Sequence, residues 1–379
     1  MNITVPKCGS TEYMARDMCS RLGLGFVEAP DYSERTVELG VTLSPEHVCF
    51  PCKVLIGSSV EAIELGADTI MMAAGFGPCR FNYFAEIMRR VLEREGYHVR
   101  IVTFDGPRDA PLDFFRNVRL IVPAANKGLA GMARDLTLSL RKGWAFDEIE
   151  KQAMAVRALE SEENATDKAV AECLSVLDAA WTRREIDEAR EWIGDRFARV
   201  PVDPESPHIK VGLVGELLMS LEPYFNFDVV RWLARHGATV ERSLHMSDVF
   251  TPLGRNPVLG YNTPEINKAA SPFLCHEVGG HGHISVGATV QFARRGFDAI
   301  VHFFPFTCLP EVISKTVFMR ISNEFDIPIL SVSVDEQTGR AGMQTRLEAL
   351  MDVAWNSKMK HGERLGSSPV VAPRDKVTL

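Results

Sequence analysis

The segment Val48–Phe84, VCFPCKVLIGSSVEAIELGADTIMMAAGFGPCRFNYF, carries cysteines at both ends of one predicted helix and strand. Its first part, Lys53–Leu65, has apolar residues at helical spacing and ends before Gly66. The apolar run Thr69–Ala74 follows, as expected for a strand buried on both faces. The sequence therefore predicts a helix–strand unit that delivers Cys79 just beyond the carboxyl end of a parallel strand.

The same order of features returns in the second half of the chain. Cys275 opens a Gly-rich loop, a predicted helix over Ser285–Arg295 follows, and an apolar run leads to Cys308. Between helix and run, the segment Gly296–Ile300 repeats the Gly-x-Asp-x-Ile pattern of Gly66–Ile70. Each half therefore contains one cysteine before a helix and another after the strand that follows.

The spacing of these features is also conserved between the two halves. The aspartate of the repeated pattern precedes the next cysteine by 11 residues in the first half and by 10 in the second. A predicted strand that ends in an acid follows in each half, over Val99–Asp105 and Ile329–Asp335. Such spacing indicates internal duplication of an α/β unit, and duplicated units commonly face each other across a cleft.

The composition restricts the class of protein. The 379 residues are 46% hydrophobic and 24% charged, which is typical of a globular chain long enough for two or three domains. A net charge of −8 without a Lys/Arg-rich run argues against a nucleic-acid partner. We find no apolar run long enough for a membrane span and no secretion signal in MNITVPKCGS at residues 1–10. We therefore expect a soluble, cytoplasmic protein without a membrane partner.

The chain divides into four regions by pattern. The predicted regions are an α/β domain at 1–110, a helical insertion and linker at 111–207, an α/β domain at 208–355 and a polar tail at 356–379. Strands and helices alternate in both α/β regions, as in parallel sheets. The insertion has helical spacing over Asp113–Leu140 and Phe146–Arg199, with a break predicted between them.

Eight cysteines in a chain without a secretion signal are expected to be free thiols, because the cytoplasm is reducing. Cys19 and Cys173 fall in helical apolar patterns and are predicted to be small core residues. The other six lie in loops that follow strands or open helices: Cys8, Cys49, Cys52, Cys79, Cys275 and Cys308. Thiolates at strand ends and helix N-termini suit soft-metal ligation, so these six are predicted metal ligands.

Residues beside these cysteines are further candidates. Three glycines would let backbone N–H groups approach the sulfides of a cluster: Gly77, Gly279 and Gly280. Charged side chains close enough to contact a substrate or cluster are Arg80, Glu277 and Glu311, with Lys53 beside them. Charge at helix termini explains these side chains equally well.

Three alternatives stay open. Cys49-x-x-Cys52 has the spacing of half a structural zinc site, and His276, His281 and His283 share one loop, so a His/Cys zinc site is one alternative. The same cysteine pair also fits a thioredoxin-like redox motif. Unmetallated structural thiols are the third alternative. The chain has neither GxxxxGK[ST] nor a full GxGxxG, so we expect no nucleotide binding through those loops.

Five blocks of sequence carry a resemblance to a known family. They are CFPCKVLIGSSVEAIELGADTI, AGFGPCRFNYF, FLCHEVGGHGHISVG, VHFFPFTCLPE and SVDEQTGRAGMQTRLEA. Together they resemble the 2-hydroxyacyl-CoA dehydratase-like superfamily, and within it the acyl-CoA dehydratase activase-related branch, over about residues 1–110 and 208–355. The resemblance implies an iron–sulfur protein of flavodoxin-like domains. It also implies a homodimer or a heterodimer with a related subunit, and a separate ATP-hydrolysing activase that carries its own cluster and supplies low-potential electrons.

By motif position, the resemblance implies that the cluster thiols are Cys49, Cys79, Cys275 and Cys308. The branch commonly reads GPCRFGYY where this chain has Asn82 and Phe84, and Cys8 and Cys52 are additional thiols. A single 4Fe–4S cubane needs three or four ligands. Six would suit an 8Fe–9S double cubane, as in the double-cubane cluster proteins of the wider superfamily, which reduce small molecules with ATP-driven electrons.

We therefore predict an α/β fold of two duplicated flavodoxin-like parallel-sheet domains that face each other across a cleft, with an inserted helical region. The predicted function is that of an iron–sulfur redox protein, a reductase or dehydratase-like enzyme acting on a small molecule, with a double cubane favoured over a single 4Fe–4S cluster. The alternatives are an accessory protein that carries a cluster for a dehydratase without catalysing, and a zinc-stabilised structural protein.

Overall fold

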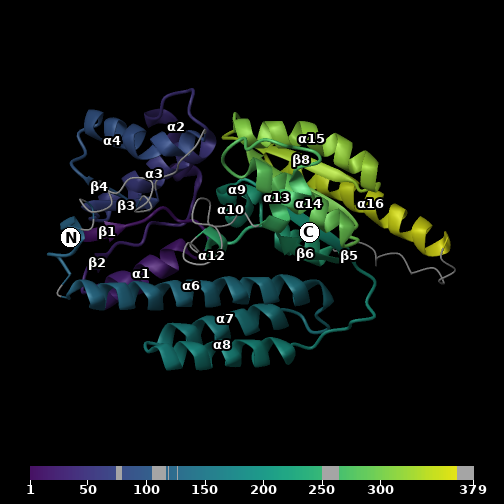
Figure 1. Cartoon of the computed structure of the whole chain (residues 1–379), viewed down its shortest axis with the longest axis horizontal. Coiled ribbons are helices and arrows are strands. Elements are labelled where there is room, and N and C mark those ends of the chain that lie inside the picture. Colours follow the sequence, from purple (N-terminus) through teal and green to yellow (C-terminus); the bar gives the residue numbers. More distant parts are fainter. Residues whose placement is uncertain (74–78, 105–116, 118, 126, 250–263, 365–379) are drawn as a thin grey trace.

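The computed structural model describes residues 1–73, 79–104, 117, 119–125, 127–249 and 264–364 (Figure 1). Gly77 and the predicted strand end at Asp105 lie outside these ranges. The described residues form two four-stranded sheets in which every pair of neighbouring strands is parallel. The predicted α/β class with parallel sheets is confirmed.

The first sheet has helices on both faces. Its strands are β1 (Asn2–Thr4), β2 (Gly25–Phe26), β3 (Thr69–Ala73) and β4 (Arg100–Phe104), in the order β2-β1-β3-β4. Its helices are α1 (Thr11–Leu22), α2 (Glu34–Leu43), α3 (Phe50–Glu64), the 3₁₀ turn η1 (Arg80–Tyr83) and α4 (Phe84–Arg94). Side chains alternate between the faces of a strand, so Ile70 and Met72 share a core with α3 and α4, whereas Met71 packs with α1.

The second sheet is built in the same way. Its strands are β5 (Ile209–Gly215), β6 (Ala238–Arg242), β7 (Ala299–Pro305) and β8 (Ile329–Val334), in the order β6-β5-β7-β8. Its helices are α9 (Leu217–Leu221), α10 (Pro223–Asn226), α11 (Val229–Arg235), α12 (Met246–Val249), α13 (Pro264–Ala270), α14 (Gly282–Arg294), α15 (Leu309–Phe325) and α16 (Arg340–Arg364). Val211 and Leu213 pack with α16, and Val214 packs with α14 and α15 on the opposite face. Each sheet therefore presents the carboxyl ends of buried strands to the loops that carry the cysteines.

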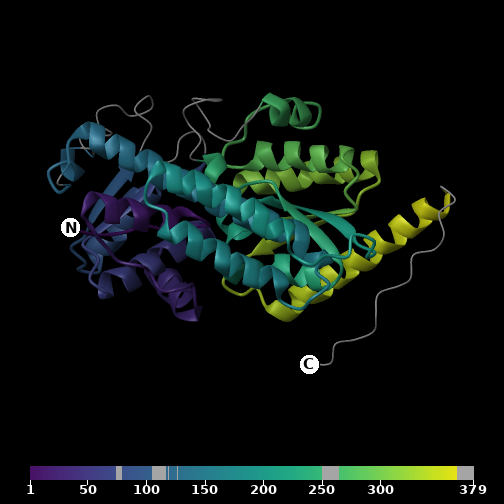
Figure 2. The same cartoon turned by 90° about the horizontal axis from the view of Figure 1, so that it is seen from below.

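A layer of helices lies against both sheets. It consists of α6 (Leu129–Val156), the 3₁₀ turn η2 (Arg157–Leu159), α7 (Ala165–Ala179) and α8 (Arg183–Ala198). Figure 1 shows α6 running beneath both sheets, and Figure 2 shows the layer from below. Helix α6 contacts α1 beside the first sheet and β6 and α12 in the second, so it joins the two halves.

The break predicted between Leu140 and Phe146 is wrong, because α6 continues through this segment. Gly143 within this segment lies against α1, and a β-carbon built there would be 2.2 Å from Met14 Sδ. The glycine therefore serves the close approach of two helices, which outweighs its low helix propensity.

Three predicted helix ends also shift. Helix α3 begins at Phe50 with Pro51 in its first turn, where the missing N–H costs nothing, so Cys52 lies in the helix and not in the preceding turn. Helix α14 begins at Gly282. Helix α16 continues to Arg364, so the predicted polar tail begins as helix, and residues 365–379 lie outside the description. Within the described ranges, we find no helix long and apolar enough to span a membrane.

The two halves contact each other along a seam of aromatic and charged side chains. The Phe225 ring lies 4.7 Å from the Tyr32 ring and 5.6 Å from the Phe50 ring, measured between centroids. Lys53, a predicted site residue, forms a 3.0 Å ion pair with Glu336 across the same seam. Because Phe50 and Lys53 belong to the first turn of α3, this packing fixes the position of the Cys49 loop against the second half.

Candidate metal centre

Three of the predicted ligands occupy equivalent local positions. Cys49 precedes α3, Cys79 precedes η1 and Cys308 precedes α15, each as the N-cap residue. A backbone N–H group two or three residues further along the chain favours each thiolate, because helix N-termini leave their first N–H groups without helical partners. Each cysteine therefore lies where the backbone stabilises negative charge on sulfur.

These three thiols come from both halves and influence one another. Burial is the main cause of the raised pKa values of Cys49 and Cys308, and charge on Cys79 adds to the first shift as charge on Cys49 adds to the second. The sulfur of Cys79 also approaches the loop before α14, since a β-carbon built on Gly280 would lie 3.6 Å from Cys79 Sγ. A glycine at this position keeps space open beside that sulfur.

Arg80 joins the three cysteine loops. Its Nη1 donates a hydrogen bond to the carbonyl oxygen of His47 at 2.6 Å, and its Nη2 donates to the carbonyl oxygen of Thr307. His47 precedes Cys49 by two residues, Thr307 directly precedes Cys308, and Arg80 itself follows Cys79. Thr307 has a φ of 66°, in the left-handed region, so the strained turn before Cys308 is held by this contact. The planar guanidinium fork lets two separate nitrogen atoms of Arg80 bind the two carbonyl groups at once.

Burial controls the protonation of the thiols. Removal from water raises the pKa of Cys49 to about 11 and raises the pKa values of Cys52, Cys308 and Cys8 well above the usual range. It also raises the pKa of Cys79. Such thiols are neutral at physiological pH, and a cation bound between them would favour their thiolates.

Glu216, which the sequence analysis did not assign a role, lies among these cysteines. Its charge raises the pKa values of four of them: Cys8, Cys49, Cys79 and Cys308. Its Oε2 accepts a hydrogen bond from the N–H of Met219 at 3.1 Å, and burial raises its own pKa to about 7. The available signal was positional, because Glu216 directly follows β5 and Cys8 follows β1, the first strands of their sheets.

Glu311 occupies a buried network behind Cys308. Its Oε1 accepts a hydrogen bond from Ser285 Oγ at 3.1 Å, and its Oε2 accepts one from His302 Nε2 at 2.9 Å. His302 Nδ1 lies 3.0 Å from Ser331 Oγ, and both Glu311 and His302 are fully buried. Because a carboxylate only accepts, His302 Nε2 is the donor in its hydrogen bond with Glu311 Oε2. The structure therefore gives Glu311 a positioning role in the core beneath the cysteine loop.

The remaining predicted ligands differ in their surroundings. Cys52 is buried in the apolar core shared by the two halves. Cys8 is partly buried, and the charges of Glu222, Glu216 and Asp147 raise its pKa. Cys275 is exposed.

The loop that follows Cys275 holds the other predicted residues. Gly279 donates its N–H to Glu277 Oε1 at 3.3 Å, so this N–H is directed at an exposed carboxylate. His283 is buried, with its Nδ1 3.9 Å from Glu277 Oε2. Over the ranges that the structure describes, we find no group of three or more His, Cys, Asp or Glu side chains placed to hold a metal ion.

Cys19 and Cys173 are both fully buried in apolar clusters, as predicted for core cysteines.

Comparison of the chain with known proteins adds no assignment: no protein-family model matches it, and no curated protein matches it significantly.

Proposed function

We propose that this protein is an iron–sulfur redox protein of the 2-hydroxyacyl-CoA dehydratase-like superfamily, fed with low-potential electrons by an ATP-hydrolysing activase. The observation that carries the proposal is the contact of Arg80 with the loops of Cys49 and Cys308, beside Cys79. A surface arginine that joins three cysteine loops from two halves of a chain is expected if those cysteines act as one site.

We also propose that the two halves are duplicated flavodoxin-like domains that face each other across a cleft. Numbered in chain order within each sheet, both sheets have the strand order 2-1-3-4. Cys79 follows the third strand of the first sheet and Cys308 follows the third strand of the second, each before a helix. The shared strand order and the equivalent cysteines support a common origin.

Four cysteines would hold the cluster. Cys49, Cys79 and Cys308 are N-cap residues whose thiolates are stabilised by backbone N–H groups, and Gly280 leaves space beside Cys79. Cys275, in the same loop as Gly280, completes the set that the resemblance implies. When bound, the cluster would accept single electrons and offer an iron site to a substrate. Glu216 would place a carboxyl group within reach of that substrate, where it can hold a proton.

We favour a single 4Fe–4S cubane over the double cubane that the six thiols suggested. Cys52 is enclosed by apolar side chains, where a thiol acts as a small core residue. Cys8 packs against an apolar cluster of Met14, Leu221 and Met246, where a thiol also acts as a small core residue. These surroundings support four ligands, and about four irons per chain are therefore expected.

Exposed apolar side chains beside the cysteines supply a surface for the activase. Phe306 and Leu309 flank Cys308, and Tyr83 lies four residues beyond Cys79. Large exposed apolar side chains that gather in one region mark protein interaction sites. A partner bound here would bring its own cluster close to the cysteine loops. A second copy of this chain or a related subunit is the competing occupant.

Anaerobic purification with iron, sulfide and zinc analysis tests the proposal. We expect a visible absorption band and iron with matching sulfide, both lost in Cys49→Ser, Cys79→Ser and Cys308→Ser. Cys19→Ser and Cys173→Ser are matched controls that should retain the band. A colourless protein, or zinc in place of iron, would refute the proposal and favour a zinc-stabilised or unmetallated protein. Substrate reduction with activase, ATP and a reductant then separates an enzyme from an accessory cluster carrier.

A further inference from the structure

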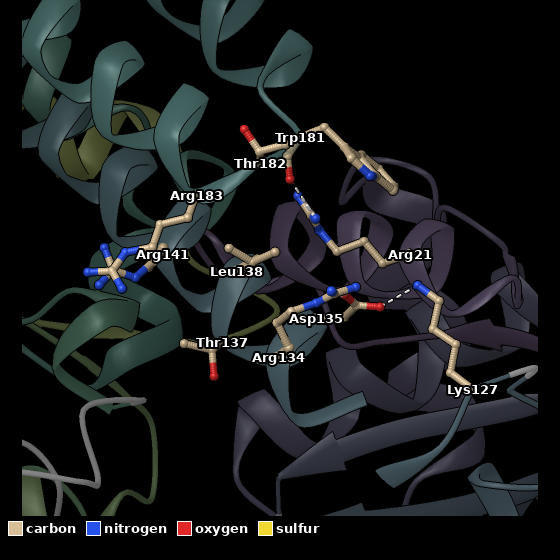
Figure 3. Close-up of a pocket in the computed structure, with 10 residues that line it drawn as sticks. All are labelled: Arg21, Lys127, Arg134, Asp135, Thr137, Leu138, Arg141, Trp181, Thr182 and Arg183. Carbon is tan, nitrogen blue, oxygen red and sulfur yellow. Dashed lines mark hydrogen bonds and ion pairs between the residues drawn. The ribbon is translucent and has the colours of Figure 1, made fainter. Parts of the chain in front are cut away.

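A cavity of about 540 Å³ lies away from the cysteines, between the end of α1, the first turns of α6 and the turn from α7 to α8 (Figure 3). Its lining is cationic although the chain has a net charge of −8. The cations are Arg21, Lys127, Arg134, Arg141 and Arg183, and the lining includes one carboxylate, Asp135.

Two carboxylates are each shared by two of these cations. Asp135 forms ion pairs with Lys127 and, at 3.3 Å, with Arg134. Asp187 forms ion pairs with Arg141 at 3.0 Å and with Arg183 at 3.7 Å. Among the described residues, these four positive side chains therefore share two negative ones, which leaves one excess positive charge in each set.

Arg21 also lines the cavity and is held by several contacts. Arg21 is buried and forms a 2.6 Å ion pair with Asp17. Asp17 also forms a 3.1 Å ion pair with Lys142. Arg21 Nη1 donates to the carbonyl oxygen of Trp181 at 2.7 Å, and its guanidinium group lies 4.2 Å from the centre of the Trp181 ring. The half-exposed indole of Trp181 therefore lines the cavity with the guanidinium group of Arg21 stacked against it.

We propose that this cavity binds a small molecule that carries two or more phosphate groups. In Figure 3, Arg141 and Arg183 lie on one side and Lys127 on the opposite side, with Arg134 between them. Two separated sets of excess charge fit two phosphates better than one, and guanidinium groups bind phosphate oxygens with paired hydrogen bonds. The volume falls in the range of small-molecule sites. No cysteine lines the cavity, so this site is separate from the proposed metal centre.

The test is titration of the full-length protein with inorganic phosphate, pyrophosphate, tripolyphosphate and ATP, followed by calorimetry and tryptophan fluorescence. The test variant is Arg134→Gln/Arg183→Gln, because these side chains are 71% and 72% exposed and their ion pairs are long. Arg184→Gln is the matched control, since Arg184 neighbours Arg183 on α8, is 89% exposed and pairs with Glu188 outside the cavity lining.

We expect saturable binding of one polyphosphate per chain, weaker binding of phosphate, and affinity that falls with added salt. The double variant should lose at least about tenfold in affinity, because it removes two charge-assisted contacts, while Arg184→Gln should bind as the wild type does. Tighter binding of ATP than of tripolyphosphate would also support the proposal, and it would indicate that the adenine base contacts the Trp181 indole. Failure of the folded wild type to bind any of the four probes, or equal loss in Arg184→Gln, would overturn the proposal.

Discussion

Glu311 is expected to be the most sensitive single position for stability in the second half. Its carboxylate is fully buried and accepts hydrogen bonds from His302 and Ser285. Replacement by alanine removes one partner of a buried polar pair and leaves both donors without an acceptor. Each buried donor left without an acceptor costs about 1–3 kcal/mol, so we expect the free energy of unfolding to fall by about 2–6 kcal/mol in Glu311→Ala.

Urea unfolding of the cluster-free protein measures this change, because the slope and midpoint give the free energy of unfolding directly. Glu311→Gln keeps an acceptor of nearly the same shape and should cost only about 1–2 kcal/mol. It also provides a variant that remains measurable if Glu311→Ala does not fold. The matched control is Glu324→Ala on the same helix, whose exposed carboxylate lies 4.0 Å from Arg320 and should contribute at most about 1 kcal/mol.

The relative stability losses of Glu311→Ala, Glu311→Gln and Glu324→Ala show whether the buried network stabilises the fold. The reasoning is refuted if Glu311→Ala loses no more stability than Glu324→Ala, because the buried network would then contribute nothing to the fold. It is also refuted if Glu311→Gln loses as much as Glu311→Ala, since the acceptor oxygen would then be irrelevant.

Four further predictions each concern a single residue. Arg80→Ala removes both hydrogen bonds to the carbonyl groups of His47 and Thr307, so iron release to a chelator should reflect an affinity about 10–100-fold lower; unchanged release would contradict this. Burial raises the pKa of Glu222 from 4.5 to about 7, so the folded state keeps a proton that the unfolded state has already lost. Its contribution, up to about 3 kcal/mol, is therefore lost as the pH rises from about 5 to about 8, and urea unfolding should show a smaller fall in Glu222→Gln; identical pH profiles would count against it. Gly57→Ala should lower the free energy of unfolding by about 3 kcal/mol, because the added β-carbon would lie 2.0 Å from the carbonyl oxygen of Thr36. Urea unfolding measures this loss, and an unchanged midpoint would contradict it. Gly194→Ala in α8 meets nothing within 4 Å and should gain about 0.5–1 kcal/mol; a loss there would contradict the helix-propensity argument.

The sequence by itself determined the elements and their class. The apolar runs near Thr69 and Ile329 are parallel strands, the first buried and the second partly buried. These features depend on the spacing of apolar residues along a short stretch, which is set by helix and strand geometry alone. The repeated pattern in the two halves likewise predicted two parallel sheets.

Tertiary structure decided which residues meet. Arg80 reaches Thr307 across more than half of the chain, and Glu216 comes to lie among cysteines from both halves. Gly143 lies inside α6, where α1 packs closely against it, although the predicted helices stop on either side of this segment. Contacts of this kind depend on how helices and sheets pack around shared cores. Local periodicity carries no information about which distant side chains that packing brings together.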